Sequence, residues 1–259
     1  MIELPPPLIL PERPALVVPG RRLVTPAEAR GIGHNGVPCE AFMPGVTGVV
    51  GTQAPLLLTY LQRATPNSND LSTYIFSGQN FGAEASDRYL IASIISTDNP
   101  NARSFISCSI GGVAATKMLS LGEGAASSNV LGFYGALVPT GTSGAVSVTF
   151  NSTMQVCGLT LYRATGLRSL TPFDSDTVNT AATPLTLTID IPSGGMVLAA
   201  VWGAVDTRTT WTNATENDDA NIISGSNNWS NASASRLNAQ TGRAVSSSAT
   251  SRGLAGSWR

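Results

Sequence analysis

Charged residues are scarce in this sequence. They make up 12% of its 259 residues, whereas about 25% is typical of soluble domains. The surface must therefore consist largely of Ser, Thr, Asn and Gly. The formal net charge of −1 provides no basic face, which a protein that binds nucleic acid normally uses to meet the phosphate backbone. We therefore expect no nucleic-acid partner.

Export signals and membrane spans are also missing. Glu3 stands where a secretory signal would carry positive charge, and Pro11 and Pro14 interrupt the apolar run that follows. No segment reaches the roughly 18 consecutive apolar residues that a membrane-spanning helix requires. We therefore expect a protein that is made and folded in a cytoplasm and has no membrane span.

Cysteine is rare as well. The chain has Cys39, Cys108 and Cys157, and no pair has the CxxC spacing of a zinc or redox motif. Cys108 and Cys157 fall in predicted strands, where a free cysteine usually behaves as a small core residue. Cys39 precedes those strands and is the candidate for an intermolecular disulfide. We expect neither a cofactor nor a metal ion.

Proline, by contrast, is concentrated near the N-terminus, where the first 45 residues hold nine of the sixteen prolines. Proline fixes φ and removes the backbone donor, so a helix and a central strand are both disfavoured there. The same segment carries apolar side chains that a solvated tail would not keep, namely Leu4, Leu8, Ile9, Leu10, Leu16, Val17 and Val18. We therefore predict that residues 1–45 form an extended arm that anchors the protein on another surface.

After residue 45 the pattern changes to short strands separated by turns. Residues 156–163 alternate cleanly, with Cys157, Leu159 and Leu161 on one face. Turn signals recur about every 8–12 residues without a long helical period, which is typical of an antiparallel β-sandwich or jelly roll. We therefore predict an all-β fold in which residues 46–259 form one sandwich domain, and in which a loop at 164–183 is the alternative boundary. Strands are predicted at residues 56–62, 73–80, 89–97, 104–110, 113–119, 130–138, 145–150, 156–163, 185–191, 195–202 and 253–258.

Residues suited to catalysis are few. His34 is the only histidine, and it lies among glycines outside the sandwich, so a Ser-His-Asp triad is not supported. The densest acidic cluster could bind calcium or supply the two carboxylates of a glycosidase, but a solvated turn is the simpler interpretation. The cluster consists of Glu216, Asp218 and Asp219, and the two further candidates are Asp174 and Asp176.

The four tryptophans all lie in the C-terminal quarter, at Trp202, Trp211, Trp229 and Trp258. Aromatic rings can stack on sugars, but they are also the largest core side chains. A core role is the simpler interpretation of these four rings. Because Trp211 is flanked by Thr and Trp229 by Asn and Ser, these two are the better candidates for exposure and for contact with a glycan if one is bound.

Several turn sequences resemble those of a known group of proteins. They are SIGGVAAT at 109–116, VPTGTSG at 138–144, and the spacing from LYR at 161–163 through IPSGG at 191–195 to GSWR at 256–259. Together they resemble uncharacterised virion structural proteins of tailed phages and prophages of alphaproteobacteria, and GIGHNG at 31–36 resembles a motif common in phage and host proteins of those bacteria. The resemblance covers most of residues 70–259. It implies a virion component: a head decoration or fibre, a neck or collar protein, or a tail component.

Three functions are therefore considered. The first is a non-enzymatic virion structural protein, attached to capsid, neck or tail subunits through its arm and exposing a β-sandwich. The second is a carbohydrate- or receptor-binding module of the phage tail or head fibre that contacts a host surface glycan. The third is a glycan hydrolase, which would need converging carboxylates such as Asp218 and Asp219. A homo-oligomer is expected in each case, since virion symmetry multiplies subunits.

Overall fold

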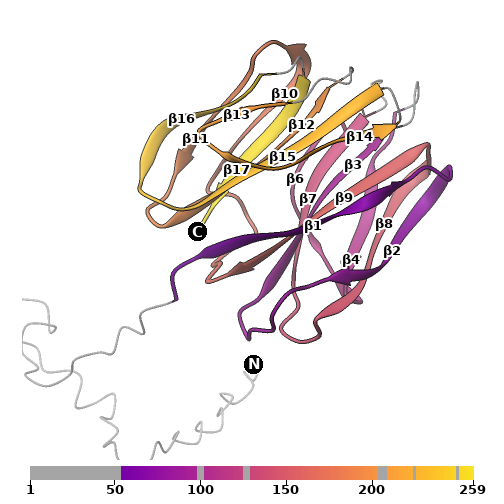
Figure 1. The fold of residues 1–259 in the computed structure, drawn as a ribbon, viewed down its shortest axis with the longest axis horizontal. Coiled ribbons are helices and arrows are strands. Elements are labelled where there is room, and N and C mark those ends of the chain that lie inside the picture. Colours follow the sequence, from indigo (N-terminus) through magenta and orange to yellow (C-terminus); the bar gives the residue numbers. More distant parts are fainter. Residues whose placement is uncertain (1–53, 98–101, 125–128, 204–208, 224–225, 249–250) are drawn as a thin grey trace, which may run out of the picture. The chain divides into compact units, whose positions relative to one another are not determined.

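The computed structural model describes residues 54–97, 102–124, 129–203, 209–223, 226–248 and 251–259 (Figure 1). These residues form strands, turns and connecting segments, and their strands pair antiparallel. The predicted all-β antiparallel sandwich is confirmed. The predicted arm, with its anchoring residues Leu4 to Val18, His34 and Cys39, lies outside the described residues.

The first half of the described chain contains nine strands. They are β1 (Leu57–Asn67), β2 (Leu71–Asn80), β3 (Tyr89–Thr97), β4 (Phe105–Ile110), β5 (Val113–Ala114), β6 (Thr116–Leu121), β7 (Asn129–Leu137), β8 (Ser143–Met154) and β9 (Val156–Thr165).

The second half contains eight strands. They are β10 (Asp174–Ala182), β11 (Leu185–Ile191), β12 (Gly195–Gly203), β13 (Trp211–Thr212), β14 (Thr215–Ile223), β15 (Ser226–Leu237), β16 (Gln240–Ser247) and β17 (Ser251–Trp258).

The two halves repeat one strand order. Sheet A of the first half has the order β1-β9-β3-β7-β6, and sheet C of the second half has the order β10-β17-β12-β15-β14. Sheet B (β2-β8-β4-β5) and sheet D (β11-β16-β13) match in the same way, with β5 as the additional edge strand. Each half is therefore a two-sheet sandwich in which strands alternate between the sheets, as in a jelly roll.

The sheets stack in the order B, A, C, D, because buried side chains form three successive apolar clusters. One cluster lies between sheets A and B, the second between A and C, and the third between C and D. We call the interface between sheets A and C the seam. Its largest members include Ile91, Ile95, Phe133, Leu198, Trp229 and Trp258.

The central strands of sheets A and C are buried on both faces. In β3, Leu90 and Ile94 enter the first cluster while Ile91 and Ile95 enter the seam. An antiparallel sheet commonly leaves one face in water and alternates polar with apolar residues. Covering the second face removes the need for alternation, so β3 and β12 carry almost continuous apolar runs. Burying each aliphatic side chain contributes about 1.5–3 kcal/mol.

One end of the first sandwich is held by Arg88, whose side chain is fully buried. Its guanidinium donates to backbone carbonyls of two loops, the β2–β3 loop and the β7–β8 loop, and burial lowers the pKa of Arg88. The five acceptors are the carbonyl oxygens of Val138 (2.6 Å), Phe81 (3.3 Å), Gly82 (3.1 Å), Thr140 (2.9 Å) and Gly141 (2.7 Å).

The junction between the two sandwiches lies at residues 166–173, inside the segment 164–183 that the sequence predicts to be a loop. Part of that prediction is wrong, because β10 occupies Asp174–Ala182. The sequence of β10 has no apolar face that would indicate a strand, because β10 is an edge strand whose side chains are exposed or only partly buried along its whole length. The link is fixed to the last strand: the N–H of Arg168 donates to the Arg259 carbonyl at 2.8 Å.

Candidate functional site

Asp218 forms the polar centre of the seam. It lies on β14 beside a register shift, and it accepts hydrogen bonds from Thr160 Oγ1 on β9 and from Asn231 Nδ2 on β15, the latter at 3.0 Å. Ser93 Oγ on β3 donates to Asn231 Oδ1 at 2.6 Å. The network therefore joins two strands of sheet A to two strands of sheet C.

Burial governs the electrostatics of this network. Desolvation raises the pKa of Asp218, and the hydrogen bonds from Thr160 and Asn231 together with the charge of Arg63 offset only part of that effect. Burial, and then the negative charge of Asp218, raises the pKa of Tyr162. Both carboxylate oxygens accept hydrogen bonds inside a packed interface, so Asp218 serves as a structural acceptor that holds the two sandwiches in register.

The other candidate acids point elsewhere. Asp219 follows Asp218 along β14 and therefore faces the opposite side of sheet C, where it accepts a bond from the Thr209 N–H at 2.6 Å. Asp174 and Asp176 accept bonds from backbone N–H groups of β11 at 2.6 and 2.8 Å. The prediction that Glu216, Asp218 and Asp219 form a solvated turn is wrong, because these residues lie on the strand β14. Within the described ranges, no three His, Cys, Asp or Glu side chains are close enough to hold a metal ion.

The predicted glycan contacts differ in exposure. The prediction that Trp229 is exposed is wrong: its side chain is only 1% exposed and packs in the seam against Gly158, whose missing side chain leaves room for the indole ring. Trp211 is half-buried, and its Nε1 donates to Ser230 Oγ at 2.7 Å. A glycan contact by Trp211 stays a prediction.

The two cysteines predicted to be core residues are buried, and both are free thiols. Burial raises the pKa of Cys108 to about 12 and raises that of Cys157 as well. Neither thiol is therefore a nucleophile at neutral pH.

Among the residues that the structure describes, Phe173 is the aromatic side chain that lies open to solvent, and it is not one of the predicted site residues. Its side chain is 62% exposed, and its N–H donates to the Ser257 carbonyl at 2.7 Å, which fixes its backbone to β17. Phe173 lines a groove of about 400 Å³ together with Asp190, Pro192 and Gln240. We call this the Phe173 groove. An aromatic face beside a carboxylate and an amide is suited to stacking on a sugar ring and bonding its hydroxyls.

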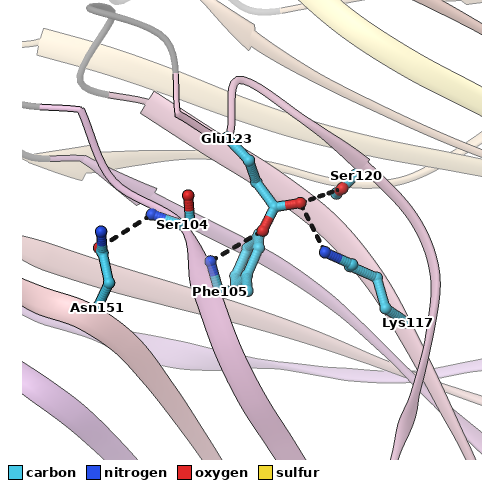
Figure 2. Close-up of polar contacts among 6 residues, drawn as sticks. All are labelled: Ser104, Phe105, Lys117, Ser120, Glu123 and Asn151. Atoms are coloured by element: carbon cyan, nitrogen blue, oxygen red, sulfur yellow. Dashed lines mark hydrogen bonds and ion pairs between the residues drawn. The ribbon is translucent and has the colours of Figure 1, made fainter.

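A second polar cluster closes the edge of the first sandwich (Figure 2). Glu123 accepts hydrogen bonds from the Phe105 N–H of sheet B at 2.9 Å and from Ser120 Oγ of sheet A at 2.5 Å, and it pairs with Lys117 at 2.8 Å. Burial alone would raise the pKa of Glu123, but these three partners outweigh it and lower the pKa. Lys117 is the only lysine in the chain, and it serves here in joining two sheets.

The fold and this surface hollow define a tandem jelly-roll protein that carries a candidate ligand groove beside Phe173. Comparison of the chain with protein-family models, with curated proteins and with solved structures finds no match. In the part of the chain that the structure describes, no helix is long and apolar enough to cross a membrane.

Proposed function

We propose that this chain is a non-enzymatic structural protein of a bacteriophage particle, a head decoration, head fibre, neck or collar component. Residues 1–45 attach it to other virion subunits, and the sandwich residues are exposed on the particle. The turn sequences described above suggest this class, and the duplicated jelly roll supports it because jelly-roll sandwiches recur in viral capsid proteins. That argument is an analogy of fold.

The observation that carries the proposal is the character of the outer sheet faces. The outward side of sheet B combines Ile75 and Ile106, which are 59% and 65% exposed, with Ser and Thr side chains of β4 and β8. Sheet D presents Thr186, Thr188 and Ser246 on its outward side. Broad uncharged faces let copies pack in a regular array with little charge repulsion, and a homo-oligomer follows from the symmetry of a particle.

Quantitative mass spectrometry of purified particles tests the proposal, with the major capsid protein as the reference for copy number. Hundreds of copies per particle would mark a capsid decoration or head fibre, and about a dozen would mark a neck or tail component. Absence from the particle would refute the structural role. A chain that lacks residues 1–30 should remain folded yet be missing from particles; incorporation at full occupancy would refute the anchoring role of the arm.

A second candidate function, carbohydrate binding, is favoured by the Phe173 groove. Aromatic stacking contributes about 0.5–1.5 kcal/mol beyond area burial, so Phe173→Ala should weaken oligosaccharide binding about 2- to 10-fold. Ile106→Ala is the matched control, because Ile106 is about as exposed as Phe173 but lies on sheet B. Equal binding by the two variants would remove the groove from consideration.

A further inference from the structure

A basic cleft of about 280 Å³ opens at the end of the seam, beside the Phe173 groove. Its walls come from separate parts of the chain: the start of β1, the link after β9, the β11–β12 turn, the end of β15 and the end of β17. Three arginines line it, namely Arg168, Arg236 and Arg259, together with Ser193 and Gly194. We call this the arginine cleft.

Charge is unusually concentrated in the arginine cleft. The chain has only 15 basic residues in all, yet three line this one hollow and none of its lining residues is acidic. All three side chains are exposed. Asp87 is a nearby carboxylate, and its Oδ2 accepts a bond from the Gly166 N–H at 2.8 Å. Three guanidinium groups around a hollow create a positive potential that favours an anion.

The backbone of Arg236 is strained at the position where its side chain lines the arginine cleft. Its φ is +57°, in the left-handed region that costs a non-glycine residue about 1–2 kcal/mol. It sits where the pairing of β12 with β15 shifts register, between Gly195↔Leu237 and Val197↔Ala234. Such bulges re-aim a side chain and occur next to functional sites. The strain is retained at a residue whose side chain lines the arginine cleft.

The arginine cleft and the Phe173 groove are lined by consecutive residues of one turn. The β11–β12 turn is closed by the Gly195 N–H bonding to the Pro192 carbonyl at 2.9 Å. Pro192 lines the groove and the next residue, Ser193, lines the cleft. A ligand of a few linked units that occupies the groove can therefore place a neighbouring unit in the cleft.

We infer that the arginine cleft binds the oxyanion of an acidic carbohydrate, with a carboxylate or sulfate held by Arg168, Arg236 and Arg259 and an adjacent sugar ring stacked on Phe173. Arginine matches these groups because its planar fork donates two parallel hydrogen bonds to them. The carbohydrate part rests on the proposed glycan binding of the Phe173 groove, whereas anion binding rests on the cleft alone. Neither part depends on attachment to a virion.

Isothermal titration of the full chain tests this inference with three probes: hexagalacturonate, a neutral galactan hexasaccharide, and inorganic sulfate. We expect hexagalacturonate to bind at least tenfold more tightly than the neutral hexasaccharide, and the difference to shrink as salt screens the charges. A triple variant, Arg168→Gln, Arg236→Gln and Arg259→Gln, should lose that preference, with single variants losing about two- to fivefold. Arg103→Gln is the control, since Arg103 lies outside the cleft, is only partly buried and makes a surface hydrogen bond to the Thr153 carbonyl at 3.0 Å.

The outcomes separate the two parts of the inference. If the triple variant keeps the preference for hexagalacturonate, the arginine cleft is not the anion site. If inorganic sulfate binds as tightly as hexagalacturonate and Phe173→Ala changes neither, the cleft takes a bare oxyanion and the carbohydrate assignment is overturned. If the triple variant binds hexagalacturonate no more tightly than the neutral hexasaccharide, and Phe173→Ala weakens the binding of both oligosaccharides, both parts hold. Far-ultraviolet circular dichroism of each variant verifies that the fold is intact.

Discussion

Replacing Arg88 with methionine should destabilise the protein more than replacing any exposed arginine. Methionine keeps much of the length of the side chain but supplies no donor, so five backbone carbonyls lose their partner at once. These carbonyls belong to two loops that Arg88 holds together at one end of the first sandwich. The side chain is fully buried, and water cannot simply replace it without moving the loops.

The magnitude follows from the type of bond. A hydrogen bond from a charged donor contributes about 1.5–3 kcal/mol net, but the five bonds share one guanidinium and three of them are only part-buried, so they do not add. Leaving a buried acceptor without a partner costs about 1–3 kcal/mol, and two of the five bonds are fully buried, so we expect Arg88→Met to lose about 3–5 kcal/mol. Arg88→Lys keeps the charge but lacks the planar fork that bonds to both loops, so it should lose about 1.5–3 kcal/mol.

Urea unfolding followed by tryptophan fluorescence measures this loss, because Trp229 and Trp258 are buried in the seam and report on its opening. Thermal unfolding should show a Tm lower by about 6–20 °C, from about 2–4 °C per kcal/mol for a domain of this size. Arg103→Met is the control; Arg103 is only partly buried and its hydrogen bond to the Thr153 carbonyl is at the surface, so this substitution should cost at most about 1 kcal/mol. The reasoning is refuted if Arg88→Met is within about 1 kcal/mol of that control.

Three further perturbations test the seam, the sheet edge and a turn. Asp218→Ala should cost about 2–3 kcal/mol by leaving buried donors unpaired. Because the folded pKa of Asp218 is raised, its stabilising contribution is present below about pH 4 and is lost as pH rises through the folded pKa. Asp218→Asn should therefore gain stability relative to the wild type between about pH 4 and 7. If the difference in unfolding free energy between the two proteins does not change with pH, the role of burial is refuted. Glu123 has a lowered folded pKa, so its stabilising contribution is present above about pH 4.3 and is lost as pH falls through the folded pKa; urea titrations of Glu123→Gln should show the wild-type advantage vanishing in acid. Gly122→Ala should cost more than about 3 kcal/mol, since its φ is +82° and an added Cβ would lie 2.1 Å from the Asn129 carbonyl oxygen; Gly112→Ala, with a φ of +80° and open space around the Cβ, should cost only about 1–2 kcal/mol in the same assay.

Much of the fold could be predicted because its strongest signals are local. The strands β3, β9 and β12 stand out as apolar segments bounded by turns, and their bounds agree closely with the predicted ones. The strands β10, β14 and β15 are hidden by polar composition. In β14 and β15, Asp218 and Asn231 bond to each other within sheet C and to Thr160 and Ser93 across the seam, and such long-range pairings leave no periodic signal in the sequence.

The candidate site was much less predictable. Phe173 lies in a polar stretch without strand character, and its exposure follows from the link between the sandwiches rather than from its neighbours in sequence. Trp229, flanked by Asn and Ser, gave the opposite error. Those polar neighbours predict an exposed ring, but Gly158 on another strand leaves room for it in the seam. The three arginines of the cleft lie up to 91 residues apart, at positions 168, 236 and 259, and only the duplicated topology brings them together.

The four-layer stack itself determines where a ligand could bind. Sheets A and C are covered on both faces, so their side chains are committed to the clusters on either side. The outward faces of sheets B and D are pleated surfaces that present Ser, Thr and, on sheet B, Ile side chains, which favour contact with another flat surface over enclosure of a small ligand. The two hollows described above are formed where turns of different strands meet. The arginine cleft and the Phe173 groove share the β11–β12 turn. A protein of this architecture can therefore assemble through its sheet faces and bind a ligand at these turns without either activity constraining the other.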